Sequence, residues 1–426
     1  MILPCRIHRI RSHIDSLPFA FLFAAFLLIP YNKAIGQYAG GGLTSGAGGA
    51  GGEGGVPLEI TTGLDFGYDD HVIGSNAATS SNSPTSLFAK ENLVLTYNRP
   101  GEETEFKVLA VGRFTQFLDV NTEDKDLTLT ATLTHNFTTR LSFNAEIYGA
   151  YQTEPNFQSN VGPTNVRAPH FDTNDVFSLT YHWLPRLSTV TSYTFQRIKY
   201  ESSSVSTSAI AGAQDRFQNT LAERLQYILT SRTSLTGEYR YEVIDYDTAP
   251  RDATIHYALA GVDHHLTEHL SINLLGGPSF RFFKNDGNTI NPYAQVKIDY
   301  HGDNHTLGWI TTYGVEQPSQ TLAAGSTTLR TGLDSSYDLT SRTKLTAAAY
   351  YHHEENQGGA GAAVATSARS TDSLHFALGL KYTINKHFTA HLDYEYTNQT
   401  GGGGTSSGGT SGYTRNRYFA GLNYTY

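Results

Sequence analysis

The chain has 426 residues, a formal net charge of −9, 12% aromatic residues and only 16% charged residues. Soluble domains usually contain about 25% charged residues. The 27 Tyr and 22 Phe exclude an intrinsically disordered chain, because disorder requires few aromatics. After position 36 no apolar run reaches the about 18 residues of a membrane-spanning helix, which argues against a helical membrane protein. Glycine and tyrosine are spread evenly, so the composition marks no domain boundary.

Residues 1–36 are typical of a secretory signal peptide. Three arginines precede an apolar stretch over 17–30, and Ala34 and Gly36 provide the small residues that a signal peptidase reads. We expect cleavage after Gly36; an N-terminal anchor helix is the alternative. Cleavage removes four basic residues, one acidic residue and the only cysteine, Cys5, which changes the net charge from −9 to −12. The exported chain then forms no disulfides, and its acidic balance argues against nucleic-acid binding.

Residues 37–57 are rich in glycine and show no apolar period, which predicts a flexible segment. From Leu58 to the C-terminus, apolar and polar residues alternate with a period of two. The pattern is clearest over 58–70, 127–137, 141–152, 235–243 and 388–396. Such a period over about ten residues predicts strands with one apolar and one polar face.

Short turns of similar sequence recur between these strands. Six of them carry a basic residue at a corresponding position, namely Arg140, Arg186, Arg232, His269, Arg342 and His387. Eight short turns alternate with nine connections that are mostly long and rich in Ser, Asn and Gly, which predicts 18 strands, with 16 as the alternative. A propeller with a similar repeat length would need four strands per repeat, whereas each interval here holds two.

This pattern favours an all-β fold, a transmembrane antiparallel up-and-down β-barrel over 58–426, rather than a soluble sandwich. So many long strands exceed what one open soluble sheet usually holds. Closure removes every sheet edge, and in lipid no water satisfies a free edge. The apolar faces also end in aromatics such as Tyr97, Trp183 and Tyr241, as expected at a membrane interface.

The C-terminal segment 418–426 places Tyr418, Ala420, Leu422, Tyr424 and Tyr426 on one face. Gly421, Tyr424 and Tyr426 resemble the assembly signal of outer-membrane proteins, although Phe419 stands where that signal usually has a polar residue. With the signal peptide and the hairpin repeats, the chain resembles a bacterial outer-membrane porin, and more narrowly the β-barrel porin families known mainly from sequence. The resemblance implies an integral outer-membrane barrel in contact with outer-membrane lipid, which the barrel-assembly machinery recognises through its C-terminal strand.

If the polar faces point inward, charged side chains line the lumen of the barrel. Barrels of 16–18 strands are wide enough for an aqueous channel. Mixed charges there bias ion passage, although the same residues could instead fill the interior with salt bridges. We favour a channel, because only the short Gly-rich segment precedes the barrel. The candidate channel-lining residues are Lys107, Glu146, Glu238, Arg240, Glu242, Arg281, Lys297, Asp299, Arg330, Asp334, Lys381, Asp393 and Glu395, and Arg224 shares their pattern.

One predicted strand, 217–229, fits the pattern poorly. Its apolar face, with Leu221 and Leu225, also contains Asn219 and Glu223. A charge that faces lipid near the midplane costs roughly 2–4 kcal/mol. We therefore expect either a bulge in this strand or a register that places Glu223 at the rim.

The sequence offers no catalytic site, no metal site and no cofactor site. The pairs His264-His265 and His352-His353 point to opposite faces of a strand, so neither pair clamps one ion; we expect them to be solvated in turns or loops. The expected function is passive diffusion of small hydrophilic solutes or ions, without enzyme activity. The alternatives are a non-conducting structural or surface-interaction barrel and, more weakly, a barrel-embedded hydrolase. The sequence leaves the oligomeric state open.

Overall fold

A computed structural model describes residues 57–72, 84–154, 169–201, 215–247, 251–284, 287–317, 325–357, 370–401 and 412–426. The predicted signal peptide, 1–36, and residues 37–56 of the predicted flexible segment lie outside the described residues. No helix in the described ranges is long and apolar enough to cross a membrane.

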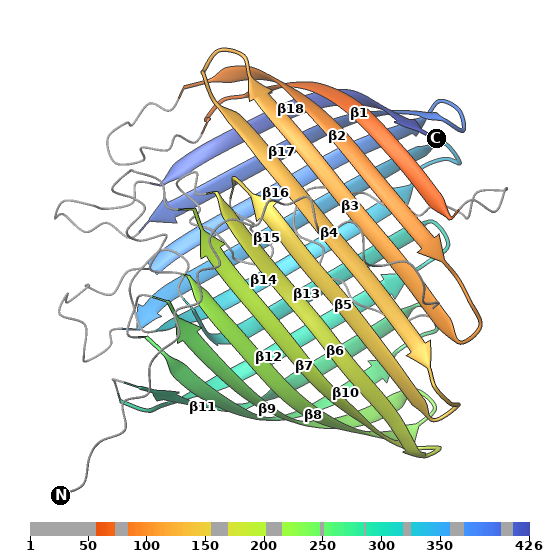
Figure 1. Cartoon of the computed structure of the whole chain (residues 1–426), viewed down its shortest axis with the longest axis vertical. Helices are drawn as coiled ribbons and strands as arrows, with labels where there is room; N and C mark the ends of the chain where they lie inside the picture. The colour runs from red at the N-terminus through yellow and green to blue at the C-terminus, as the bar shows by residue number, and fades with distance from the viewer. Residues whose placement is uncertain are drawn as a thin grey trace, which may run out of the picture.

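Eighteen strands form one closed antiparallel sheet in the described part of the chain (Figure 1). Strands that follow one another in sequence pair with one another, and β1 pairs with β18 to close the barrel. The predicted barrel of 18 strands is confirmed, and the alternative of 16 is wrong. The strands are β1 (Leu58–Asp69), β2 (Ser86–Arg99), β3 (Thr104–Phe117), β4 (Glu123–Asn136), β5 (Leu141–Gln152), β6 (His170–Leu184), β7 (Leu187–Tyr200), β8 (Arg216–Thr230), β9 (Thr233–Tyr246), β10 (Ala253–His265), β11 (Leu270–Phe283), β12 (Thr289–His301), β13 (His305–Glu316), β14 (Gly325–Asp338), β15 (Thr343–Gln357), β16 (Ser370–Thr383), β17 (Phe388–Gly401) and β18 (Tyr413–Thr425).

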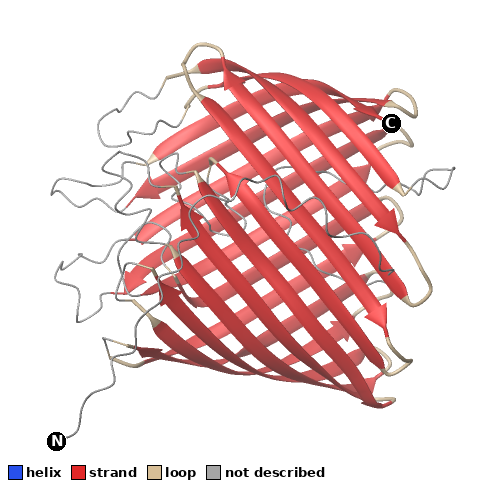
Figure 2. Ribbon diagram, in the orientation of Figure 1, coloured by secondary structure: helices blue, strands red, loops and turns tan. Residues whose placement is uncertain are grey.

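The recurring turn sequence has a structural reason. In the turn after β4, the Thr138 hydroxyl accepts hydrogen bonds from the backbone N–H groups of Arg140 and Leu141 at 3.1 and 3.0 Å. Thr267, Thr340 and the Asn385 amide oxygen do the same in later turns. A side-chain oxygen two residues before the basic residue therefore stabilises each of these turns. The short turns gather at the end of the barrel where the C-terminus lies (Figure 2).

The two faces of the sheet are reversed relative to a soluble protein. Large apolar side chains are exposed on the outside, among them Phe66 at 60%, Leu225 at 49% and Leu422 at 45%. Inside, Asp69 and Arg281 are among the largest fully buried side chains. An apolar outer surface of this extent is stable only in an apolar solvent, because contiguous exposed apolar patches of soluble monomers rarely exceed a few hundred Å². The alternation read from the sequence thus separates a lipid-facing side from a lumen-facing side.

Glu223 is a charged residue on the largely apolar outer face, and both expectations for its strand are wrong. The register of β8 with β7 and β9 is regular around it, and the bulge lies beyond, between Ile228 and Thr230. Glu223 stands at the middle of β8 on the same face as Phe217 and Tyr227, which frame it on either side. Its carboxylate accepts a hydrogen bond from the Thr191 hydroxyl at 2.6 Å. A carboxylate at the middle of a strand destabilises the barrel if lipid alone covers it.

Replacing Glu223 with leucine should therefore raise the free energy of unfolding, by about 1–2 kcal/mol, since an acid on the lipid face costs somewhat less than a base. The measurement is urea unfolding of the barrel refolded into lipid vesicles, and Glu223→Gln should give a smaller gain. A loss of stability for Glu223→Leu would instead mean that a partner covers this carboxylate.

Candidate channel lumen

Five of the 13 predicted lumen residues, together with Arg224, line one cavity inside the barrel. The cavity has a volume of about 610 Å³ and is bounded by strands β5 to β14. Its charged lining residues are five arginines and four acids, namely Arg216, Arg224, Arg240, Arg281, Arg330, Asp172, Glu238, Glu242 and Glu316. The sequence singled out all of these except Arg216, Asp172 and Glu316. The predicted inward face therefore brings distant strands to one polar cavity.

The other predicted lumen residues lie on the same face but outside this cavity. Lys107 on β3 and Glu146 on β5 lie on either side of Thr132 of β4, which pairs with both of them. Asp334, Ala348, Ala377 and Glu395 are successive register partners across β14, β15, β16 and β17. Lys297 forms a salt bridge of 3.0 Å with Asp299. The residues of this group are Lys107, Glu146, Lys297, Asp299, Asp334, Lys381, Asp393 and Glu395.

The middle of the cavity wall carries one carboxylate between two guanidinium groups. Glu238 lies opposite Arg224 in the register of β9 with β8, and Arg240 follows two residues later on the same face. The Arg224 Nε donates to Glu238 Oε2 at 2.5 Å, and the Arg240 Nε donates to Glu238 Oε1. The Glu238 side chain is 1% exposed, whereas those of Arg224 and Arg240 are 39% and 21% exposed. The acid is therefore covered by the two bases that face the cavity.

Arg330 and Arg281 line other parts of the same cavity. Arg330 Nη2 donates to Glu316 Oε1 at 2.7 Å. Arg281 is 2% exposed, and neither Nη1 nor Nη2 has a hydrogen-bond partner among the described residues. A Cβ atom added to Gly325 would lie 2.5 Å from Arg281 Nη1, so this glycine makes room for the guanidinium. Arg330 is thus held by an ion pair, whereas Arg281 is enclosed by the wall.

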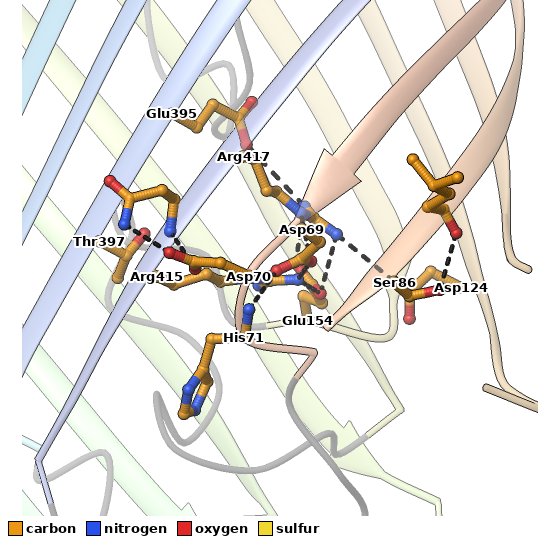
Figure 3. Close-up of polar contacts among 12 residues, drawn as sticks. Asp69, Asp70, His71, Ser86, Asp124, Glu154, Glu395, Thr397, Arg415 and Arg417 are labelled. Atoms are coloured by element: carbon orange, nitrogen blue, oxygen red, sulfur yellow. Dashed lines mark hydrogen bonds and ion pairs between the residues drawn. The ribbon is translucent and has the colours of Figure 1, made fainter. Parts of the chain in front are cut away.

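A second charged cluster joins the first strand, the last strand and the connection after β5 (Figure 3). Arg415 Nε and Nη2 donate to Asp69 at 3.0 and 2.5 Å, and Arg417 Nε donates to the same carboxylate at 2.9 Å. Glu154 accepts from Arg415 Nη2 at 2.8 Å and from Arg417 Nη1 at 3.2 Å. Arg417 also lies 3.8 Å from Glu395, the one predicted residue of this cluster.

The electrostatics of the cluster fix the charge of Glu154. Burial alone would raise the pKa of Glu154, but the guanidinium groups of Arg415 and Arg417 outweigh it and hold this pKa below its usual range. The start of the connection between β5 and β6 is therefore tied to β18 by a charged pair. Sequence reasoning missed this cluster, because Asp69 and Arg415 are 346 residues apart.

The proposed C-terminal assembly residues lie on β18 and at the residue after it. Tyr424 and Tyr426 are 37% and 82% exposed, on the outer face. Gly421 faces inward opposite Asp65, where a Cβ would come within 2.1 Å of Asp65 Oδ1. Asp65 in turn contacts Lys90 at 2.9 Å and His391 at 3.0 Å. A side chain at position 421 would therefore displace a buried acid.

The histidine pairs point to opposite faces of their strands, as predicted. His353 Nδ1 lies 2.8 Å from Asp372 Oδ1 on the outer face. His352 is buried on the inner face, with 7% of its surface exposed. The expectation that these two are solvated in a turn or loop is wrong, because both lie within β15. Within the described ranges, no group of three or more His, Cys, Asp or Glu side chains is arranged to hold a metal ion.

A closed, even-numbered antiparallel barrel with an apolar outside and a charged inside is the architecture of bacterial outer-membrane proteins. The protein is therefore an integral β-barrel of the outer-membrane type.

Comparison with models of protein families and with curated proteins gives no match. Among solved structures, the chain is similar to OccK5 (OpdH) of Pseudomonas aeruginosa, with 13% identity over 87% of this chain and 98% of that one and a TM-score of 0.42. It is also similar to Pseudomonas aeruginosa OpdL, with 14% identity, 87% and 98% coverage and a TM-score of 0.41. The copper transporter OprC gives 12% identity, 87% and 80% coverage and a TM-score of 0.42. These TM-scores are below 0.5, so the assignment to the outer-membrane type rests on the strand register and the apolar outer surface of the chain itself.

Proposed function

We propose that the protein is an outer-membrane channel for the passive diffusion of small hydrophilic solutes or ions. The observation that carries this proposal is the cavity of about 610 Å³ inside the barrel, lined by nine charged residues. An 18-stranded barrel is wide enough to enclose an aqueous path, and charged walls keep such a path wet. The 13 lumen residues predicted from the sequence are the proposed lining of this path.

The proposal predicts discrete open steps when the purified protein is added to a planar bilayer between symmetric KCl solutions. Channel activity should depend on the amount of added protein and be absent with detergent alone. A barrel that is fully folded, as judged by circular dichroism and resistance to protease, but gives no steps would contradict the proposal. That outcome would favour the non-conducting structural barrel.

We also propose that residues 1–36 direct export and are removed, and that the barrel-assembly machinery recognises the strand that contains Gly421, Tyr424 and Tyr426. The basic, apolar and small-residue pattern of 1–36 supports the first step. The outward-facing aromatics of β18 support the second. No enzyme activity is part of this proposal.

A further inference from the structure

We propose that six of the short turns anchor the barrel in the phospholipid leaflet on the periplasmic side, each through one apolar side chain and one basic residue. These are the turns after β4, β6, β8, β10, β14 and β16, at the end of the barrel where the C-terminus lies (Figure 2). In outer-membrane barrels the short turns face the periplasm. The inference concerns the lipid around the barrel and does not depend on the proposed channel.

Each of the six turns exposes a large apolar residue three positions before its basic residue. Between 45% and 56% of the surface of each apolar residue is exposed. The Trp183 indole packs on Tyr181 with ring centres 4.6 Å apart and donates to Thr189 Oγ1 at 3.1 Å, and both partners lie on the outer face. The exposed turn residue thus continues the lipid-facing surface. The six residues are Phe137, Trp183, Leu229, Leu266, Leu339 and Ile384.

The backbone of these turns makes most of its hydrogen bonds within the barrel. The carbonyl oxygen of every one of the six basic residues accepts a hydrogen bond from a backbone N–H group of a neighbouring strand, at 2.8–2.9 Å. In four of the turns a Thr hydroxyl or the Asn385 amide oxygen accepts from two further N–H groups. Paired backbone groups tolerate the boundary of a lipid layer, where unpaired ones are costly.

The charges of the six turns are complementary to a layer of lipid phosphates. From the apolar to the basic residue, the six segments contain four arginines, one lysine and two histidines against a single acid, Glu268, in a chain whose net charge is −9. The other two short turns, 100–103 and 302–304, contain three acids, no base and no large apolar residue. Basic residues beside exposed apolar ones are typical of segments that lie in the headgroup region.

A lipid surface fits these turns better than a soluble partner. The six turns are spread along the rim from β4 to β17, one to a hairpin, instead of forming one patch. The ring of His387 stacks on that of Tyr424, with centres 5.7 Å apart, so this basic residue also adjoins an aromatic residue of the outer face. The surface that these turns extend is the lipid-facing wall of the barrel, which encircles it in the same way.

Depth-dependent fluorescence quenching tests where the turns lie. The full-length barrel is refolded into phosphatidylcholine vesicles that contain lipid brominated near the headgroup or near the chain end. The chain has two tryptophans, so Trp183→Phe with Trp309→Phe gives a background without tryptophan. In this background Leu339→Trp should be quenched more by bromine near the headgroup than by aqueous iodide. Asp303→Trp, in an acidic turn, is the matched control and should be quenched mainly by iodide.

Lipid selectivity tests the basic residues. With Trp309→Phe alone, Trp183 reports on its own turn, and brominated phosphatidylglycerol should quench it more than brominated phosphatidylcholine at the same mole fraction. Combining Arg140→Gln, Arg186→Gln and Arg232→Gln should lower this preference for the anionic lipid by about fivefold or more, because one arginine near an anionic surface contributes about that factor. Raising the KCl concentration should weaken the preference in the chain that keeps its arginines.

Two further variants separate charge from folding. The triple change of the same arginines to lysine keeps the charges and should keep the preference for phosphatidylglycerol. Lys125→Gln, Lys199→Gln and Lys284→Gln together remove three charges at the opposite end of the barrel and should leave quenching of Trp183 unchanged. The proposal is overturned if iodide quenches Leu339→Trp more than the bromolipids do, which would place the turns in water and favour a soluble partner. It is also overturned if the arginine-to-glutamine variant keeps its preference.

Discussion

Replacing Arg415 with methionine should lower the free energy of unfolding by about 3–5 kcal/mol, because the change leaves the buried carboxylate of Asp69 without its main partner. Asp69 is fully buried and accepts from Arg415 through two nitrogens. The variant also frees Glu154 from its hydrogen bonds with Arg415. Urea unfolding in lipid vesicles, followed by tyrosine and tryptophan fluorescence, measures the change.

Lys125→Met is the matched control. Lys125 forms its salt bridge with Glu123 on side chains that are 59% and 45% exposed, so its loss should cost less than about 1 kcal/mol. Combining Arg415→Met with Asp69→Asn removes the unpaired charge and should recover part of the lost stability. Equal, small effects of Arg415→Met and Lys125→Met would show that the cluster does not hold the seam between β1 and β18 together.

Two neighbouring arginine substitutions should differ greatly in cost, according to the face of β8 on which each one falls. Leu225 is 49% exposed on the outer face, whereas Gln226 follows it on the inner face. Leu225→Arg places a charge in lipid and should cost about 2–4 kcal/mol, whereas Gln226→Arg places it in a wet lumen and should cost much less. The same vesicle unfolding experiment measures both.

The contrast between these two variants tests the orientation of the whole sheet. In detergent micelles, which adapt to a charge more readily than a bilayer, the difference should shrink. If Gln226→Arg proves the more costly in vesicles, the assignment of inner and outer faces is reversed.

Much of the fold follows from local periodicity. Alternation over segments such as 141–152 and 388–396 predicted both the strands and their outward faces, and the structure confirms them. The short turns were predictable for a local reason as well, because Thr138 and its counterparts bond to backbone groups only two and three residues away. Glu223 shows the limit of this reasoning: periodicity identified it as anomalous, but the regular register of β8 decided that it faces outward.

The alternation of polar and apolar residues likewise predicted that Glu238, Arg240 and Arg330 face the lumen, because successive side chains of a strand point to opposite faces. It could not predict that Glu238 lies between Arg224 and Arg240, because that depends on the register of β8 with β9. Nor could it find the contacts among Asp69, Glu154 and Arg415, which come from strands β1 and β18 and from the connection after β5.

The sequence by itself thus determined a single polar, tyrosine-rich sheet of 16 or 18 strands, with 18 favoured, together with the face on which the side chains of its clearest strands lie, since both depend on neighbouring residues. The tertiary structure decided which charges meet. Closure of the barrel joins residues 346 positions apart, and the curvature of its wall gathers five arginines and four acids around one cavity. Those contacts depend on register, circumference and side-chain conformation, which no local pattern encodes.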